Sequence, residues 1–423
     1  MTPMTPLTPL TPLTNWAGNI TFSAARVHHP TSVSAVQTLV SSHRRVGVLG
    51  TGHSFNSGAD TSGELLRLDR LPRLVEVDRA RRTVRVSAGT TFAELGPRLH
   101  EHGLALRNLG SLPHISVAGA CATATHGSGD DNPVIAAGVS AVELVTAEGD
   151  LLPLDRTAPD FPGVVVSLGA LGVVTSLTLD LVPAYDVQQY VYTDVPWQTV
   201  AAGFTDITGS AYSVSVFTDW HERTQIWVKH RMGTEAPDLD WTGGILADEP
   251  VHPVDGHCAA NCTPQLAIPG PWHLRLPHFR AEFTPSTGNE LQSEYFVRRE
   301  DTGRALTALR ALRGTMAPVL QVSEIRTVAA DEGWLSPAWQ RPATALHFTW
   351  VRDPGAVAPV VARIEEALAP LDARPHWGKV FSTPPRALAA TYGRMEDFCA
   401  LRKRLDPRGT FGNEFTDRHL PGA

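Results

Sequence analysis

A loop of alternating glycines with a histidine at its centre, GTGHSFN at residues 50–56, constrains this sequence most. The apolar run VGVL at 46–49 precedes it and predicts a buried strand that leads into the loop. Gly50 and Gly52 permit positive φ and a close approach of the backbone, and successive N–H groups in such a turn form an anion-binding nest. The loop therefore predicts a site for a phosphate-bearing ligand that His53 faces; a tight surface turn is the alternative.

The loop is not the GxGxxG fingerprint of dinucleotide-binding folds. That fingerprint needs a third small residue, because the following helix must pack closely on the strand. Asn56 occupies this position, and residues 57–59 do not begin a helix with apolar periodicity. The pattern therefore argues against a dinucleotide-binding loop of that kind.

The length and charge of the chain limit its architecture and its partners. With 423 residues it can form two domains with separate cores. A net charge of −7 argues against nucleic acid or an anionic membrane as a partner. No stretch approaches the roughly 18 consecutive apolar residues of a spanning helix, and the Thr-Pro-Leu repeats of residues 1–14 predict a disordered tail and not a secretory signal. We expect a cytoplasmic protein without membrane contact, and a monomer.

Local patterns predict an α+β unit in the first 184 residues. Thr31 or Ser32 caps a helix with an apolar face, and Thr91 with Glu94 forms a capping box at the start of another helix. The segment 111–129 is small and poor in charge, so its backbone can lie flat against a ligand. The strands expected here are residues 74–77, 83–86, 139–146 and 173–181, the first two as a hairpin.

Two later strands carry polar residues on one face only. Strand periodicity places Glu324 and Arg326 on one face of 322–328, and it places His347 and Thr349 on one face of 346–350. A sheet with its polar face in water is one explanation. The other is a pocket floor that hydrogen-bonds a hydroxyl-rich ligand.

Lys379 lies in the sequence HWGK, where aromatic and glycine neighbours favour partial desolvation. Desolvation would lower the pKa of its ammonium and make the side chain a proton acceptor; an exposed loop lysine is the alternative. Metal binding is not expected, since neither the Cys-x3-Cys step nor the proline-rich neighbourhood matches a compact zinc site. The residues considered as zinc ligands are His252, His257, Cys258 and Cys262.

Taken together, seven ordered motifs resemble the flavin-linked oxidases of the vanillyl-alcohol-oxidase superfamily, most closely the alditol oxidase branch. They are NWAGN at 15–19, GTGHSFN at 50–56, SLPHISVAGACATATHGSG at 111–129, GALGVVTSL at 169–177, the Glu-x-Arg and His-x-Thr strands, HWGK at 376–379 and LDPRGTFGN at 405–413. The resemblance implies a two-domain α+β, PCMH-type FAD-binding fold with a separate substrate domain on an antiparallel sheet. It divides the chain into the tail (1–14), an FAD-binding domain (15–184), a substrate-binding cap (185–385) and a C-terminal segment that returns to the FAD domain (386–423).

The same resemblance implies FAD as the cofactor, bound covalently through His53. The positions that match the cofactor contacts of the family are Gly50, Thr51, Gly52, Ser54, Phe55, Ser111, Ser116, Gly119, Thr123, Ala124, Thr125, His126 and Val174. Gly110 matches the place where related enzymes control oxygen access, and its lack of a side chain favours an oxidase. Cys121 suggests a second flavin link through sulfur, with a small buried cysteine as the alternative.

For the substrate, the resemblance assigns binding to Ser111, Glu324, Arg326, Thr349 and Lys379, and catalysis to Arg326, Lys379 and His347. The implied reaction oxidises the terminal primary alcohol of an alditol such as xylitol or sorbitol and reduces dioxygen to hydrogen peroxide. A sugar-1,4-lactone oxidase or dehydrogenase of the same superfamily is the first alternative. A flavoprotein without turnover and a zinc protein are the others.

Overall fold

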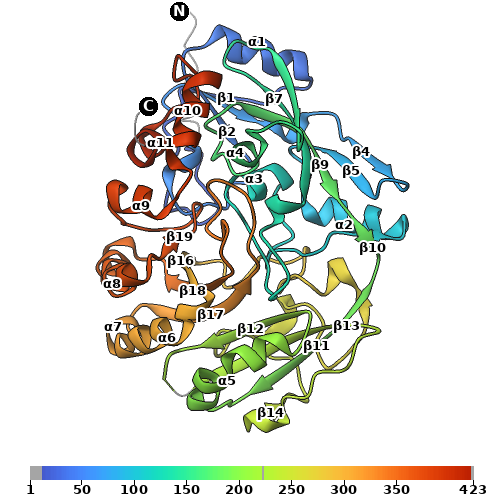
Figure 1. The fold of residues 1–423 in the computed structure, drawn as a ribbon, viewed down its shortest axis with the longest axis vertical. Helices are drawn as coiled ribbons and strands as arrows, with labels where there is room; N and C mark the ends of the chain where they lie inside the picture. Colours follow the sequence, from blue (N-terminus) through green and yellow to red (C-terminus); the bar gives the residue numbers. More distant parts are fainter. Residues whose placement is uncertain (1–11, 222, 421–423) are drawn as a thin grey trace, which may run out of the picture.

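The computed structural model describes residues 12–221 and 223–420. Figure 1 shows the N-terminal elements and the C-terminal helices α9, α10 and α11 together in the upper half of the molecule, and a large sheet in the lower half. The expected tail lies outside the described residues up to position 11. Its last part is more ordered than expected, because Leu13 accepts a backbone hydrogen bond from Phe22 (2.9 Å) and Thr14 bridges Thr21.

Two sheets form the upper half. A parallel sheet has the order β1–β3–β2 and an antiparallel sheet has the order β4–β5–β9–β7–β8. Their strands are β1 (Arg26–His28), β2 (Val46–Leu49), β3 (Glu64–Arg67), β4 (Val75–Asp78), β5 (Thr83–Ser87), β7 (Val139–Val145), β8 (Leu151–Asp155) and β9 (Val173–Asp180), while β6 (Leu104–Ala105) pairs with β10 (Val182–Pro183).

Two helices of this half begin where the sequence predicts. The Ser32 side chain caps α1 (Val33–Ser42), and Thr91 with Glu94 forms the capping box of α2 (Phe92–Glu101). The segment 111–129 contains the short helix α3 (Val117–Ala122), which local patterns did not predict. α4 (Phe161–Val164) is also short.

The lower half is a nine-stranded sheet whose main path is β14–β11–β13–β12–β17–β18–β16–β19, with β15 beside β11. All of its strand pairs are antiparallel. The strands are β11 (Asp186–Thr193), β12 (Ser213–Thr218), β13 (Thr224–Arg231), β14 (Ile245–Leu246), β15 (Gly270–Pro271), β16 (Glu290–Arg298), β17 (Leu320–Val328), β18 (Ala343–Val351) and β19 (Arg374–Pro375).

Helices cover one face of this sheet. Apolar side chains of α5 (Trp197–Gly209), α6 (Thr302–Ala311) and α8 (Pro354–Leu368) share a core with alternate residues of β16, β17 and β18, and α7 (Arg313–Met316) follows α6. Ile325, Leu346, Phe348 and Trp350 all belong to this core. The predicted alternation is therefore confirmed, and the polar residues between them lie on the opposite face, toward the upper half.

The C-terminal helices pack on the upper half. Buried residues of α9 (Pro385–Thr391), α10 (Met395–Leu405) and α11 (Glu414–His419) share one core with both upper sheets. The backbone N–H of Val46 donates to Thr410 (2.9 Å), and Asn413 donates to the carbonyls of Gly58 and Asp60 (2.9 and 3.0 Å). The end of the chain thereby braces both sides of the glycine loop.

The apolar face of the large sheet generates a stability prediction. The Phe348 ring is fully buried and stacks on Trp350 with ring centroids 5.1 Å apart. Truncation to alanine leaves a cavity that costs about 3–5 kcal/mol. We expect Phe348→Ala to lower the free energy of unfolding by that amount in urea titrations. Leu151→Ala, at a side chain that is 40% exposed, is the control and should change it by less than about 0.5 kcal/mol.

Candidate active site

A cleft runs between the upper half and the polar face of the sheet. Its wall includes the glycine loop, the segment 111–129, strands β16–β18 and the HWGK loop at 376–379. Its cavity volume is about 300 Å³, at the lower end of the roughly 300–1,000 Å³ of typical ligand pockets. The lining residues come from both halves, so a ligand in the cleft contacts the glycine loop and the polar strands together.

The glycine loop follows β2 and presents its backbone to the cleft. Gly52 has φ +73°, which favours glycine, and a Cβ at Gly50 would lie 2.6 Å from the Ser116 hydroxyl. The backbone N–H groups of residues 51–54 donate no hydrogen bond to any other residue that the structure describes. These free donors and the close packing of the loop fit a phosphate-bearing ligand.

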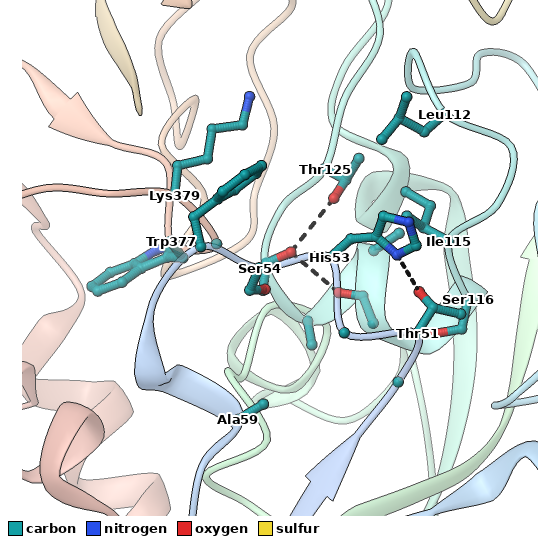
Figure 2. A pocket seen from close by; sticks show the side chains of 18 of the residues that line it. Thr51, His53, Ser54, Ala59, Leu112, Ile115, Ser116, Thr125, Trp377 and Lys379 are labelled. Carbon is teal, nitrogen blue, oxygen red and sulfur yellow. Dashed lines mark hydrogen bonds between the residues drawn. The ribbon is translucent and has the colours of Figure 1, made fainter. Parts of the chain in front are cut away.

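His53 projects from this loop into the cleft. Its Nδ1 lies 3.0 Å from the Thr51 hydroxyl, and its ring stacks on Trp16 at 5.5 Å. Burial, with a smaller contribution from His114, lowers the pKa of His53 to about 4. The imidazole is therefore neutral and nucleophilic near pH 7. Figure 2 shows Thr51, His53, Ser116 and Thr125 on one side of the pocket and Trp377 and Lys379 on the other.

The polar floor of the cleft is a row across three neighbouring strands. Glu324 of β17 pairs directly with His347 of β18, which pairs directly with Glu294 of β16. Thr349 pairs with Gln292 and Val322 in the adjacent row. These side chains meet because antiparallel neighbours on one face of a sheet lie about 5 Å apart.

Glu294 joins the cations of the site. Its carboxylate accepts from Arg326 Nη2 (2.6 Å) and Lys379 Nζ (2.8 Å), and the His126 Nε2 lies 3.3 Å away. The Arg326 guanidinium also donates to the Ser111 hydroxyl (3.3 Å). Burial would raise the pKa of Glu294, but Lys379 and Arg326 outweigh burial and hold this pKa well below its usual range.

Burial also determines the protonation of Lys379. It lowers the pKa of the ammonium, and the favourable charge of Glu294 offsets only part of this effect. The predicted desolvation of Lys379 is thus present in the structure.

A second carboxylate, Glu324, is held by His278. The two side chains lie 2.8 Å apart, and Arg326 Nε is 3.5 Å from the same oxygen. Burial would raise the pKa of Glu324, but Arg326 and His278 hold it well below the usual range. Both carboxylates of the floor are therefore ionised.

The histidines around these charges are neutral, because burial lowers the pKa of each of them. The group consists of His126, His278, His347 and His376. His126, Glu294 and His376 lie close enough to share a metal ion. However, both oxygens of Glu294 already bind the cations Arg326 and Lys379, whose charges would repel a metal. The cluster therefore does not fit a metal site.

The structure brings almost all of the expected residues into this cleft. Those that line it are Gly50, Thr51, Gly52, His53, Ser54, Phe55, Ser111, Ser116, Gly119, Thr123, Thr125, His126, Val174, Glu324, Arg326, His347, Thr349 and Lys379. Ala124 is the exception among the expected contacts, since its methyl group is buried in the core and its φ is +58°. The role of each residue stays a prediction.

The hypothesis of a second flavin link through Cys121 does not fit the structure. The Cys121 side chain belongs to the apolar core of the upper half and is 1% exposed. Burial raises the pKa of its thiol to about 12, so the reactive thiolate is strongly disfavoured. The alternative, a small buried cysteine, agrees with this position.

Sequence analysis missed Glu294, Gln292, His278 and His376, all of which line the cleft. Glu294 and Gln292 alternate with Ser293 and Tyr295, so strand periodicity was a usable signal for them. His278 has no such signal, because it lies in the irregular stretch between residues 234 and 284.

Comparison with known proteins agrees with this geometry. Residues 24–155 match the family model "FAD binding domain", and residues 288–419 match "D-arabinono-1,4-lactone oxidase". An alditol oxidase from Streptomyces sp. (strain IKD472 / FERM P-14339) is 52% identical over 97% of this chain and 99% of its own. L-gulonolactone oxidase from Bos taurus is 26% identical over 96% of this chain and 97% of its own. Cholesterol oxidase from B. sterolicum has the same fold, with a TM-score of 0.78 at 15% identity and complete coverage of both chains.

The fold and the cleft define a flavoprotein oxidoreductase with a PCMH-type FAD-binding fold and an antiparallel substrate sheet. The chain belongs to the alditol oxidase family of the vanillyl-alcohol-oxidase superfamily. It binds FAD, and the free amides of the glycine loop and the small residues around Gly119 suit that cofactor. Among the described residues, none of the helices has the length and apolar character needed to cross a membrane.

The packing of the glycine loop generates a prediction about cofactor retention. In Gly50→Ala the new methyl group meets the Ser116 hydroxyl, and overpacking of this kind costs about 1–3 kcal/mol. We expect the purified variant to show a lower flavin-to-protein absorbance ratio than the wild type. Adding Ser116→Ala should restore part of the ratio. Gly138→Ala, which meets no atom within 4 Å, should leave it unchanged.

Proposed function

We propose that this protein is an FAD-dependent oxidase that converts the terminal primary alcohol of alditols, such as xylitol or sorbitol, to the aldehyde. The observation that carries the proposal is the pairing of Arg326 and Lys379 on Glu294 in a buried floor of hydroxyl-binding groups. The 52% identity to an alditol oxidase over almost the whole chain supports the same substrate class.

In this proposal the floor holds the polyol by its hydroxyl groups. Glu324, ionised and fixed by His278, accepts from hydroxyls along the carbon chain, and Thr349 and Ser111 donate or accept beside it. A substrate fixed at several hydroxyls presents its terminal carbon in one orientation, which lowers the entropic cost of reaction.

Arg326 and Lys379 act on the reacting oxygen. Arg326 remains charged and stabilises negative charge on that oxygen. Lys379 in its neutral form accepts the hydroxyl proton, a role that its lowered pKa favours. His347 is neutral, its Nδ1 has no hydrogen-bond partner among the described residues, and it offers a hydrogen bond without adding charge.

When bound, FAD would supply the redox chemistry, as two-electron acceptor from the alcohol and two-electron donor to dioxygen, which would give the aldehyde and hydrogen peroxide. We further propose that His53, as a neutral nucleophile, holds the cofactor covalently. The proposal also divides the chain into an FAD-binding domain (15–184), a cap domain (185–385) and a C-terminal segment (386–423). It further includes a monomeric protein in the cytoplasm.

A sugar-1,4-lactone oxidase is the second candidate. The match of residues 288–419 to the lactone oxidase model favours it. The lactone enzymes compared here are 25–30% identical to this chain, against 52% for the alditol oxidase, which ranks the polyol first.

A direct assay separates the two candidates. We expect the purified holoenzyme to release one hydrogen peroxide for each xylitol or sorbitol oxidised, with the aldose as product, in a coupled peroxidase assay and by chromatography. The control substrate is L-gulono-1,4-lactone. Turnover of the lactone alone would reverse the ranking, and turnover only with an artificial electron acceptor would make the protein a dehydrogenase.

The covalent link is tested by denaturation. We expect His53→Ala to release its flavin when boiled in detergent, whereas wild-type protein stays yellow after acid precipitation. His114→Ala is the matched control, because this neighbouring histidine is bonded to the Phe283 carbonyl (2.9 Å) and does not line the cleft. A variant at position 53 that keeps its chromophore through boiling would show that another residue forms the bond.

A further inference from the structure

Glu294 lies at the centre of the charges that the proposed function uses, although no role follows for it from the sequence motifs. Its side chain is fully buried, and each of its two oxygens binds a different cation. Arg326 reaches it from β17, across β18, where the facing residue is Ala345. A methyl group at that position leaves the space through which the guanidinium passes.

Lys379 reaches the other oxygen from outside the sheet. Its loop is tied to β16, because the Val380 N–H donates to the Gln292 carbonyl (2.8 Å) and the His376 N–H donates to the Glu294 carbonyl (2.9 Å). The loop is therefore fixed on both sides of Lys379, and within the described part of the chain only the carboxylate of Glu294 hydrogen-bonds the ammonium itself.

The charged groups that act on the ammonium of Lys379 come from strands β16 and β17. Glu294 and Glu324 attract its ammonium, and Arg326 repels it. The neighbouring histidines His126, His347 and His376 are neutral. Glu294 is the only anion within hydrogen-bond distance of Lys379 among the described residues, so it dominates the balance between the charged and neutral amine.

Lysine is rare in this chain, and Lys379 is one of its few lysines. All but three of the 36 Lys and Arg side chains are arginines, and the three lysines are Lys229, Lys379 and Lys403. A guanidinium does not lose its proton in a protein, whereas a buried ammonium does. A lysine beside the reacting position in a chain that otherwise favours arginine agrees with a proton-transfer role.

We propose that Glu294 is a positioning residue that holds Lys379 beside Arg326 and controls the pH at which Lys379 releases its proton to become the acceptor. The proposal rests on the proposed function, since it concerns the residue that receives the alcohol proton. Glu294 touches neither the reacting carbon nor the reacting oxygen in this assignment; it acts through Lys379.

The sign of the pH effect follows from the charges. Activity that needs neutral Lys379 rises with pH as the amine loses its proton. In Glu294→Gln the anion is gone, the pKa of Lys379 falls further, and the acid limb of the kcat/KM profile moves to lower pH. We expect kcat to fall by about 10- to 100-fold, because Lys379 loses its fixed position, with a smaller change in KM.

The small number of lysines allows a readout without substrate. Protein labelled biosynthetically with 13C-lysine gives three sets of side-chain signals, and the ε-carbon shift reports the charge of each amine. We expect the Lys379 signal to titrate at lower pH in Glu294→Gln than in the wild type. Lys229, whose pKa burial lowers to about 7, is the internal control: it donates to the Arg275 and Pro277 carbonyls and should titrate unchanged.

Three further variants complete the test. Lys379→Arg should remove the acid limb and lower kcat by about 10²–10⁴-fold, because a guanidinium cannot accept the proton. Glu294→Asp keeps the negative charge but moves it away from Lys379 by one methylene, so Lys379 should titrate at a lower pH than in the wild type, with a smaller shift than in Glu294→Gln. This variant also provides the test if Glu294→Gln does not fold. Glu365→Gln, which removes a carboxylate bonded to Tyr295 on the other face of β16, should change neither profile nor titration.

The outcomes are distinct. An unchanged Lys379 titration in the folded Glu294 variants, or equal losses of kcat at every pH, would overturn the inference and leave Glu294 a structural residue. A shifted titration in a protein that oxidises no alditol would support the control of Lys379 by Glu294 and refute the proposed substrate instead.

Discussion

The carboxylate of Glu294 is the interaction on which the rest of this site depends. Two cations, the buried Arg326 and the largely enclosed Lys379, bind the same carboxylate, and like charges so close together are costly to remove from water. Glu294 gives one oxygen to each, and Glu324 supplies the second negative charge. When Lys379 is protonated, the two cations and the two carboxylates of the floor balance. This balance lowers the cost of keeping charged groups inside the molecule.

The histidines around these ion pairs are neutral, so they add no further charge to the site. His126, His278, His347 and His376 surround the ion pairs, and burial keeps each of them uncharged. His278 hydrogen-bonds the Glu324 carboxylate, and none of the four adds a third cation to the cluster. His53 shares this state on the opposite wall of the cleft, where a neutral ring is the form that can attack an electrophile.

Much of the fold could be predicted because the signals are local. The helix caps at Ser32 and Thr91 and the alternation in β17 and β18 agree with the structure. Side-chain directions within the segment 111–129 could not be predicted. Ala124 and Cys121 belong to a motif expected to contact the ligand, yet the backbone of α3 and the turn after it direct both side chains into the core. A motif indicates which segment approaches the ligand, but backbone geometry decides which of its side chains does so.

The sequence by itself determined the glycine loop, the two polar strand faces and the candidate reactive groups, because each depends on residues close together in the chain. Only the tertiary structure decided how these groups share charge. Glu294 lies 32 residues from Arg326 and 85 from Lys379, and the pairing arises from strand order and from a loop tied to β16. Strand order follows from how the whole chain buries its apolar surface, which no local pattern of residues encodes.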